Sequence, residues 1–494
     1  MKLTKKVAVF CITAILALSS FTGCGEIISP QENDGKIHYK NEIDIKISDD
    51  KITANGRTVY KTISNIYISN DVVYYEDKDF YESGRPYGLG TDSDKHSAEE
   101  AAEVTVLNIM QAGTYRLHGK LSNGQIRIDL SKRARENANA VVTLIFDGLD
   151  VNCDIAPAII FKNVFECDPN ANPELAVSDV DTSKAGANII IADGSVNNIS
   201  GSHVAKIFKD KKGEKKQWKQ DGTIYSYMSM NIYGEPENSG ILNVTSDFEG
   251  ISTEKHITIN GGNIFIVAQN DGINVNDECS VAAINGGNMR IMAGLSEDGG
   301  DGIDSNGWIV TNGGTTVSIG HRLTDSGMDD EKACYLNGGT FVSFGSMIDW
   351  AELDSKQTCF NLQFKESIST SRAITITDKG GNIVFCYDLS DDEILSPYPS
   401  RRMGVVISSP NFSVGDTYNI YLGGRVDGEE HYGLYENSSV KGIDDPSLQG
   451  YYRERNLVHG GYELKEMKDR ALITDFVMRD TVSGFIGIGK FISK

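Results

Sequence analysis

Residues 247–268 read DFEGISTEKHITINGGNIFIVA, and the order of signals in this stretch returns three more times before Gly345. One signal is Asn-Gly-Gly, which begins at positions 260, 285, 312 and 337. The other is a polar residue followed by glycine and an apolar residue, with the glycine at positions 250, 272, 302 and 327. Short β-prone runs lie between these signals. A repeat of about 25 residues is too short to bury its own apolar face, so neighbouring repeats must stack.

The remaining chain supports an all-β fold, because helix-period segments of useful length are nearly absent. Apolar runs such as 141–146 and 158–161 are typical of strands buried on both faces. The sequence therefore predicts stacked parallel strands, as in a parallel β-helix or solenoid, over residues 104–345. We expect a β-rich segment at 36–103, a β-rich continuation or cap at 346–423, and a C-terminal segment of unassigned role at 424–494.

The N-terminus predicts export. Lys2, Lys5 and Lys6 precede a short apolar core at 7–20, which has the length of a signal peptide rather than a membrane span. The next residues, Phe21-Thr22-Gly23-Cys24, resemble a bacterial lipobox, with Phe21 in place of the usual aliphatic residue. We expect a signal peptide at 1–23, a lipid on Cys24, a tether at 24–35 and a location at the outer face of the bacterial cell membrane. An ordinary cleaved signal peptide is the alternative.

Composition restricts the partners. The formal net charge of −22 argues against nucleic-acid binding, which needs Lys and Arg side chains facing phosphates. None of the eight cysteines forms a C-x-x-C pair, so a thiolate zinc site is not expected. An exported chain can form disulfides, but the cysteines of the mature chain mostly lie in strand-like runs, which favours buried free thiols.

Aligned on the glycine of the second signal, the four repeats place oxygen donors in columns. The residue before the glycine is Glu249, Asp271, Asp301 or Ser326, the residue two after it is Ser252, Asn274, Asp304 or Asp329, and the residue four after it is Glu254, Asn276, Asn306 or Glu331. Stacked strands lie roughly 4.8 Å apart, where carboxylates repel one another unless a cation or proton intervenes. Hard oxygen donors favour Ca²⁺. The predicted calcium ligands are Asp247, Glu249, Asn270, Asp271, Asn274, Asp298, Asp301, Asp304, Asp325 and Asp329.

A second interpretation of these residues needs no metal. Asp-Gly and Asn-Gly are common turn formers, because Asp, Asn and Gly tolerate left-handed backbone conformations. A ladder of turns without calcium therefore remains possible for the acidic columns, and the Asn-Gly-Gly turns are interpreted as structural.

The order of these motifs resembles the bacterial carbohydrate-binding right-handed parallel β-helix family, which comprises pectate-lyase-like β-helix lipoproteins. The resemblance covers roughly residues 104–423 and includes the runs 113–117, 144–148 and 191–194 before the repeated signals. It implies a right-handed β-helix with calcium between coils, and a ligand such as polygalacturonate or cellulose from plant cell walls. Ser326 departs from the acidic column.

Three functions remain open. The first is a surface-anchored protein that binds polysaccharide, with Tyr225, Tyr227 and Tyr233 as candidates for stacking on sugar rings. The second is a calcium-dependent polysaccharide lyase, for which Lys255, Arg290 and Arg322 are the candidate cationic residues. A basic residue beside acids is more often an ion-pair partner than a base, which weakens this alternative. The third is an envelope scaffold or adhesin that binds calcium but no sugar.

Overall fold

The computed structural model describes much of the chain from residue 36 onward. The described residues are 27–28, 36–70, 72, 81–82, 85–86, 98–204, 220–347, 349–352, 354–363, 373–388, 404–414, 416–422, 425–441, 472–477, 482–486 and 491–492. The predicted signal peptide and the predicted lipidation site, Cys24, lie outside the described residues.

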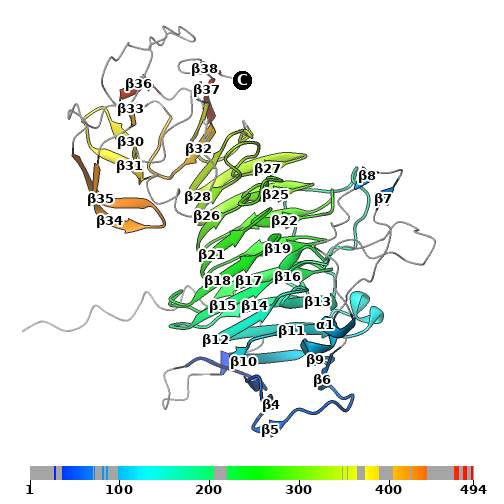
Figure 1. The fold of residues 1–494 in the computed structure, drawn as a ribbon. Coiled ribbons are helices and arrows are strands. Elements are labelled where there is room, and N and C mark those ends of the chain that lie inside the picture. The colour runs from blue at the N-terminus through cyan, green and yellow to red at the C-terminus, as the bar shows by residue number, and fades with distance from the viewer. Residues whose placement is uncertain are drawn as a thin grey trace, which may run out of the picture.

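One side of the molecule is a nine-stranded sheet in which each strand pairs with the strand one repeat further along the chain (Figure 1). Its strands pair in parallel, except that β6 pairs antiparallel to β9 at one end. The strands are β6 (Ile66–Ser69), β9 (Thr105–Ile109), β11 (Gly124–Asp129), β13 (Ile159–Asn163), β16 (Gly222–Ser226), β19 (Glu249–Thr253), β22 (Ile273–Val275), β25 (Ile303–Ser305) and β27 (Asp329–Asp330).

A 19-stranded sheet provides two further rows of parallel strands. The first row is β10 (Gly113–Leu121), β12 (Val142–Cys153), β14 (Ala187–Ile191), β17 (Met230–Gly234), β20 (Ile257–Ile259), β23 (Val281–Ile284), β26 (Trp308–Ile319) and β28 (Ala333–Gly345). The second row is β15 (Val196–Gly201), β18 (Ile241–Ser246), β21 (Asn263–Ala268) and β24 (Asn288–Met292). The long strands β12 and β26 pair with strands of both rows and so join them into one sheet.

Stacked aliphatic side chains explain why the repeats associate. Ile251, Ile273 and Ile303 occupy the same register position on β19, β22 and β25, and all three are buried. They belong to one core cluster that extends from Ile45 to Val406. Full burial of each such side chain contributes roughly 1.5–3 kcal/mol relative to exposure, so the core grows with every added repeat.

The Asn-Gly-Gly turns need glycine for two reasons. The second glycine of each turn has a positive φ: 97° at Gly262, 83° at Gly287, 78° at Gly314 and 81° at Gly339. The repeats also approach closely there, because a Cβ on Gly287 would lie 2.7 Å from the carbonyl oxygen of Gly262. Only a residue without a side chain satisfies both conditions.

The structure is all-β, but the expected open right-handed β-helix solenoid is wrong. The nine-stranded sheet and the two rows of the 19-stranded sheet enclose a single core, so the parallel strands form a closed, barrel-like body with extra sheets. Antiparallel strands pair at both ends of this body, where β4 (Thr53–Ala54) joins β3 (Ile43–Ile47) and β32 (Gly404–Ser408) joins β28. The repeat signals predicted parallel stacking, but they lie within one stretch of the chain and carry no information on these distant strands.

A six-stranded antiparallel sheet lies beyond the parallel body (Figure 1). Its strands are β30 (Ala373–Asp378), β31 (Ile383–Asp388), β33 (Thr417–Leu422), β34 (Arg425–His431), β35 (Leu434–Lys441) and β36 (Leu472–Val477). Strands from the predicted 346–423 and 424–494 segments therefore share one sheet. The sheet contacts the parallel body through Tyr432, whose ring stacks on Phe265 at 5.0 Å and whose hydroxyl lies 3.0 Å from Asn263 Oδ1.

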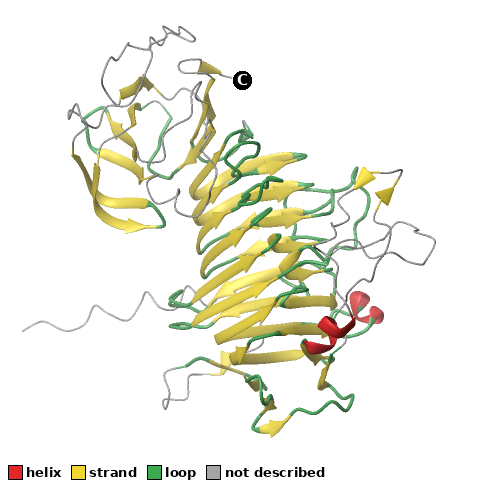
Figure 2. Ribbon diagram, in the orientation of Figure 1, coloured by secondary structure: helices red, strands yellow, loops and turns green. Residues whose placement is uncertain are grey.

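Helices are short in the described part of the chain. They are α1 (Ala98–Glu103) and a 3₁₀ turn at Lys132–Glu136 (Figure 2). Among the described residues, no helix has the length and apolar character needed to cross a bilayer.

The described cysteines are free thiols, as the sequence predicted. Five of them, Cys153, Cys279, Cys334, Cys359 and Cys386, are buried, and Cys167 is half-buried. Burial raises the pKa of the Cys153 thiol to about 11, so this side chain stays protonated and unreactive at neutral pH.

Candidate functional site

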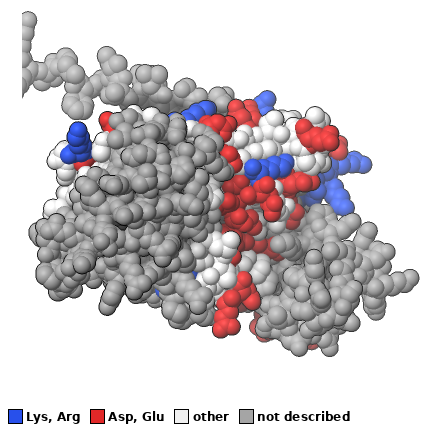
Figure 3. Space-filling model, turned by 90° about the horizontal axis from the view of Figure 1, so that it is seen from above, with Lys and Arg blue, Asp and Glu red and all other residues white. Residues whose placement is uncertain are grey.

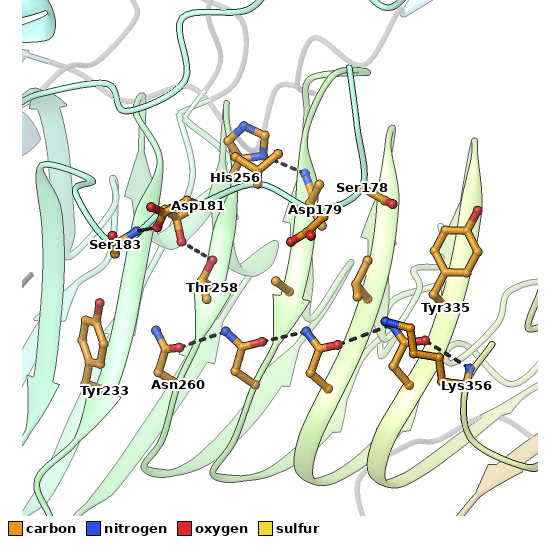
Figure 4. A pocket seen from close by; sticks show the side chains of 18 of the residues that line it. Ser178, Asp179, Asp181, Ser183, Tyr233, His256, Thr258, Asn260, Tyr335 and Lys356 are labelled. Carbon is orange, nitrogen blue, oxygen red and sulfur yellow. Dashed lines mark hydrogen bonds between the residues drawn. The ribbon is translucent and has the colours of Figure 1, made fainter. Parts of the chain in front are cut away.

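A groove of about 460 Å³ lies on the outer face of the first row of the 19-stranded sheet, over β17, β20, β23, β26 and β28 (Figure 4). The sheet forms its floor, and residues 178–183, here called the wall segment, form one side. The lining residues are Ser178, Asp179, Val180, Asp181, Thr182, Ser183, Tyr233, His256, Thr258, Asn260, Val281, Ala283, Asn285, Val310, Asn312, Tyr335, Asn337, Asp354 and Lys356.

Small side chains form the middle of the floor. Thr258, Ala283, Val310 and Tyr335 occupy one register position on four successive strands. The first three side chains are short, whereas the half-buried Tyr335 closes the line with a large ring. Another half-buried tyrosine, Tyr233 on β17, stands at the opposite end of the groove (Figure 4).

An asparagine ladder runs along the groove opposite the wall segment. Asn285 Nδ2 donates to Asn260 Oδ1 at 3.0 Å, Asn312 Nδ2 to Asn285 Oδ1 at 2.9 Å, and Asn337 Nδ2 to Asn312 Oδ1 at 3.4 Å (Figure 4). The backbone N–H of Lys356 donates to Asn337 Oδ1 at 3.2 Å and ends the ladder. Each amide has two N–H groups and two acceptor lone pairs, so these bonds leave donor and acceptor capacity on every rung.

The wall segment is fixed to the floor by side chains of β17 and β20. The hydroxyls of Thr182 and Thr258 lie 2.7 Å apart, and Asn231 Nδ2 donates to the carbonyl oxygen of Thr182 at 2.9 Å. Asp181 accepts from the backbone N–H of Ser183 at 2.9 Å, and hydrogen bonds with Ser183 lower the pKa of the Asp181 carboxyl. This side of the groove is therefore polar and negatively charged.

His256 supports the segment that leads into the wall. Its Nδ1 accepts the backbone N–H of Val281 at 3.0 Å, so its Nε2 carries the proton and donates to Asp168 Oδ2 at 3.3 Å. Burial lowers the pKa of His256, although Glu166 and Asp168 oppose this effect. His256 is thus a neutral, oriented side chain at neutral pH.

The predicted oxygen columns lie on the nine-stranded sheet, away from the groove. Ser252, Asn274, Asp304 and Asp329 pair in register as predicted. The residues that precede the repeat glycines, Glu249, Asp271, Asp301 and Ser326, also stack. The backbone N–H groups of Gly250, Gly272 and Gly302 donate to the carbonyl oxygens of Asp271, Asp301 and Ser326 at 2.9–3.0 Å. Figure 3 shows Asp and Glu side chains gathered on the face seen from above.

Burial of these carboxyls makes their charge costly. The pKa of Asp271 is raised well above its ordinary value by burial and by the nearby Glu249 and Asp304. Burial raises the pKa of Asp301 to about 8, and the Asp329 and Asp325 charges add to that effect. A cation among these groups would replace the proton that they otherwise retain.

Part of the column has acceptor capacity suited to a cation. Asn274 Nδ2 donates to Glu249 Oε1 at 2.7 Å, while Asn274 Oδ1 is buried and accepts no hydrogen bond in the described structure. An amide oxygen among carboxylates is a hard donor that suits Ca²⁺. However, no group of three or more His, Cys, Asp and Glu side chains in the described part of the chain is arranged to hold a metal ion.

The flanking residues of the predicted calcium set have protein partners or solvent around them. Asp247 accepts from Ser202 Oγ at 2.6 Å, Asn270 Nδ2 donates to Gly299 O at 3.1 Å, and Asp325 Oδ2 accepts from Gly300 N at 2.7 Å. Asp298 is exposed. The core of the predicted set is therefore Glu249, Asp271, Asn274, Asp301 and Asp304.

Two of the three predicted stacking tyrosines do not present a ring face to a ligand. Tyr225 is fully buried and donates to Glu254, and Tyr227 is buried and accepts from Gln220 Nε2 at 3.0 Å. Strand β16 places Tyr225 in register with Ile160 and Ser252, and its ring belongs to the main core cluster together with Tyr227. Tyr233 lines the groove.

The candidate lyase residues lie in three separate places. Lys255 pairs with Asp277 Oδ2 at 2.6 Å, which matches the ion-pair interpretation. Arg290 lies on β24 in register with Phe265 and Val317, and Arg322 is buried after β26.

Sequence reasoning missed the groove itself. The four ladder asparagines were interpreted only as turn formers, although their recurrence at one position of the repeat was a signal that they line up on one face. The wall segment lies outside the repeat and could not be placed beside it from the sequence.

Comparison with known proteins found one matching family model and one similar solved structure. Residues 169–396 match the family model described as "Carbohydrate-binding domain-containing protein", and this range includes the wall segment and the five groove strands. A solved structure of a polysaccharide lyase-like protein from C. thermocellum, a gadolinium derivative, is similar with 20% identity and a TM-score of 0.36 over 61% of this chain and 90% of that chain. No curated protein matches.

Proposed function

We propose that this protein binds a polysaccharide chain in the groove on the outer face of β17 to β28. The asparagine ladder carries the proposal, because it repeats one amide contact on four successive strands. Tyr233 stands before its first rung, and Tyr335 stands beside its last rung, on the neighbouring line of the floor. The match of residues 169–396 to a carbohydrate-binding family supports it.

The dimensions of the groove suit a short stretch of polymer. Five strands at a spacing of roughly 4.8 Å give a floor about 19 Å long. Amide donors and acceptors at four of these strands suit the hydroxyl groups of successive sugar rings. A tyrosine ring offers an apolar face and a hydroxyl to the same sugar.

Charge in the groove favours a neutral polysaccharide such as cellulose. Asp179, Asp181 and Asp354 line the groove, and Lys356 is the lysine among the lining residues. Carboxylates repel a uronate polymer, so binding of polygalacturonate would require cations that bridge the two sets of negative charges.

We further propose that Ca²⁺ stabilises the stacked repeats where two adjacent columns of oxygen donors meet, here called the acidic column. Glu249, Asp271, Asn274, Asp301 and Asp304 would supply the oxygen ligands, and the buried Asn274 Oδ1 is the observation that favours a cation there. Bound calcium would take the place of the protons that burial favours on Asp271 and Asp301.

The location proposed for the protein rests on the sequence. The lipobox-like residues at 21–24 support an exported protein held by a lipid on Cys24 at the outer face of the bacterial cell membrane. Such an anchor would present the groove to extracellular polysaccharide, in agreement with a role in surface binding.

Binding is favoured over lyase chemistry, because Lys255 is engaged by Asp277 and the two arginine candidates lie apart from it. The test is retention of the protein on cellulose and on polygalacturonate, with calcium and with chelator, while absorbance of unsaturated products is followed. Retention without new absorbance supports the binding function. Rising absorbance would support a lyase, and calcium-dependent stability without retention on either polymer would support a scaffold.

A further inference from the structure

The floor of the groove continues past Tyr233, but there it is covered. Arg116, Ile145, Ile190 and Tyr233 occupy one register position on β10, β12, β14 and β17. Tyr233 follows Ile232, which pairs with Ile259, so the same line leads on to Asn260 and the asparagine ladder. The covered line and the ladder are therefore two halves of one line across the sheet.

Residues 36–42, here called the N-terminal strap, cover the first half of this line. Ile37 and Tyr39 of the strap pack in one cluster with Ile145 and Ile190, and Tyr233 lies against the edge of that cluster. Tyr39 is 2% exposed, and Ile145 and Ile190 are 0% exposed, so the strap leaves no room for a ligand above them.

Charged contacts hold the strap in place. Arg116 is 3% exposed, donates to the carbonyl oxygen of Ile37 and lies 3.3 Å from Glu42 Oε1. Lys36 Nζ lies 2.6 Å from Asp147 Oδ2, which also accepts from Arg116 at 3.2 Å. A buried Arg held by three partners fixes the strap more firmly than an exposed ion pair would.

The neighbouring line of the floor, which contains Thr258, is also covered from β17 onward. The line of Thr258 continues to Asn231 on β17 and Asn188 on β14, and both side chains are buried. Asn231 Nδ2 donates to Thr182 O and Asn188 Nδ2 to Ala185 O, so the chain after the wall segment crosses over this line.

The opposite end of the groove is different. Beyond Tyr335, the lining residues Asp354 and Lys356 are exposed. Figure 4 shows Tyr233 at one end of the asparagine ladder, and Tyr335 and Lys356 at the other.

We infer that the groove is blind at Tyr233 and recognises the end of a polysaccharide chain, with the terminal sugar beside Tyr233 and the remaining polymer leaving past Tyr335 and Lys356. This inference rests on the proposed polysaccharide binding. The strap and the crossing after the wall segment block the passage that an internal segment of a long chain would need, so specificity is for chain ends.

The test compares polymers of equal mass and different length. The protein is titrated onto a soluble β-glucan and onto polygalacturonate, each before and after partial depolymerisation, and bound protein per gram at saturation is measured by analytical ultracentrifugation. We expect bound protein per gram to rise by the same factor as the number of chain ends. An unchanged value per gram would overturn the inference while leaving polysaccharide binding intact, whereas absence of binding to every sample would refute the proposed function itself.

A strap variant gives a second readout. Tyr39→Ala removes the ring that covers Ile145 and Ile190, and Tyr418→Ala removes an equally buried tyrosine from the antiparallel sheet as a matched control. Tyr39→Ala, checked for folding by circular dichroism, should raise bound protein per gram of the undegraded polymer, and the control should not. A folded Tyr39→Ala protein with unchanged capacity would contradict the blocking role of the strap, and the length comparison decides the inference even where that variant fails to fold.

Discussion

The side-chain N–H of Asn285 donates a hydrogen bond to Asn260 Oδ1 at 3.0 Å, although Asn285 lies one repeat later in the chain, and both side chains line the groove. The same residue type therefore serves the turn that joins two strands and the surface that lines the groove. Because the repeat sets the spacing of the rungs, a polymer with its own regular repeat is the ligand that this surface matches most naturally.

The ladder can be tested at its centre. Asn312→Ala removes the donor to Asn285 and the acceptor for Asn337. We expect affinity for soluble β-glucan, measured by isothermal titration calorimetry, to fall roughly 2- to 12-fold, from about 0.5–1.5 kcal/mol per hydrogen bond. Asn243→Ala is the matched control, because Asn243 makes the same kind of amide bond to Asn198 at 2.9 Å outside the groove. Equal losses in the two variants would contradict a role for the ladder in binding.

Calcium removal tests the acidic column. If Ca²⁺ replaces protons among the buried carboxyls, adding it should raise the thermal unfolding midpoint at neutral pH, and chelator should lower the midpoint. Asp301→Asn should reduce this gain, since it deletes one carboxylate while its amide oxygen can still accept from Ser326 N. Asp150→Asn, at an exposed ion pair with Lys120, is the control. Midpoints that do not respond to calcium or chelator would argue for the turn-ladder interpretation.

The stability of the protein should depend on pH through His256, which supports the segment that leads into the wall of the groove. Because burial lowers its pKa, the unfolded chain binds more protons than the folded chain below the ordinary His value of about 6.5. Stability is therefore lost as pH falls below that value, and protonation of Nδ1 would also break the bond from Val281 N. Calorimetric unfolding between about pH 5 and 8 should show this loss in the parent protein and a smaller one in His256→Gln. Identical pH profiles would show that His256 does not titrate in this way.

Because the turns pack closely, adding one methyl group there should strongly lower the free energy of unfolding. Gly314 has φ 78°, and a Cβ there would meet the carbonyl oxygen of Gly287. Gly314→Ala should lower the free energy of unfolding by roughly 1–3 kcal/mol or more. Gly381→Ala shares the positive φ of 85° but has open space around the new Cβ. Equal destabilisation by both variants would indicate that backbone strain, rather than contact between repeats, sets the cost.

Local repetition made part of this structure predictable. The register of Ser252, Asn274, Asp304 and Asp329 follows from aligning the glycines, and the strands pair as that alignment predicts. The enclosed shape of the body could not be predicted in the same way, because β3 and β32 come from distant parts of the chain.

The site depends still more on long-range contacts. Tyr225 and Tyr233 are both aromatic residues close together in the sequence, yet one is buried on the nine-stranded sheet and the other lines the groove. The wall segment reaches the floor through Thr182 and Thr258, which are 76 residues apart. No local pattern encodes such a contact.

The most direct measurement of polysaccharide binding in the groove is sedimentation of the protein with insoluble cellulose, comparing Tyr335→Ala with Tyr60→Ala. Tyr335 closes the groove floor, whereas Tyr60 is a 68% exposed tyrosine outside the groove. We predict that the parent protein and Tyr60→Ala sediment with cellulose and that Tyr335→Ala stays largely in solution. Equal retention of both folded variants, or loss of retention only with Tyr60→Ala, would contradict the assignment of the groove as the binding site.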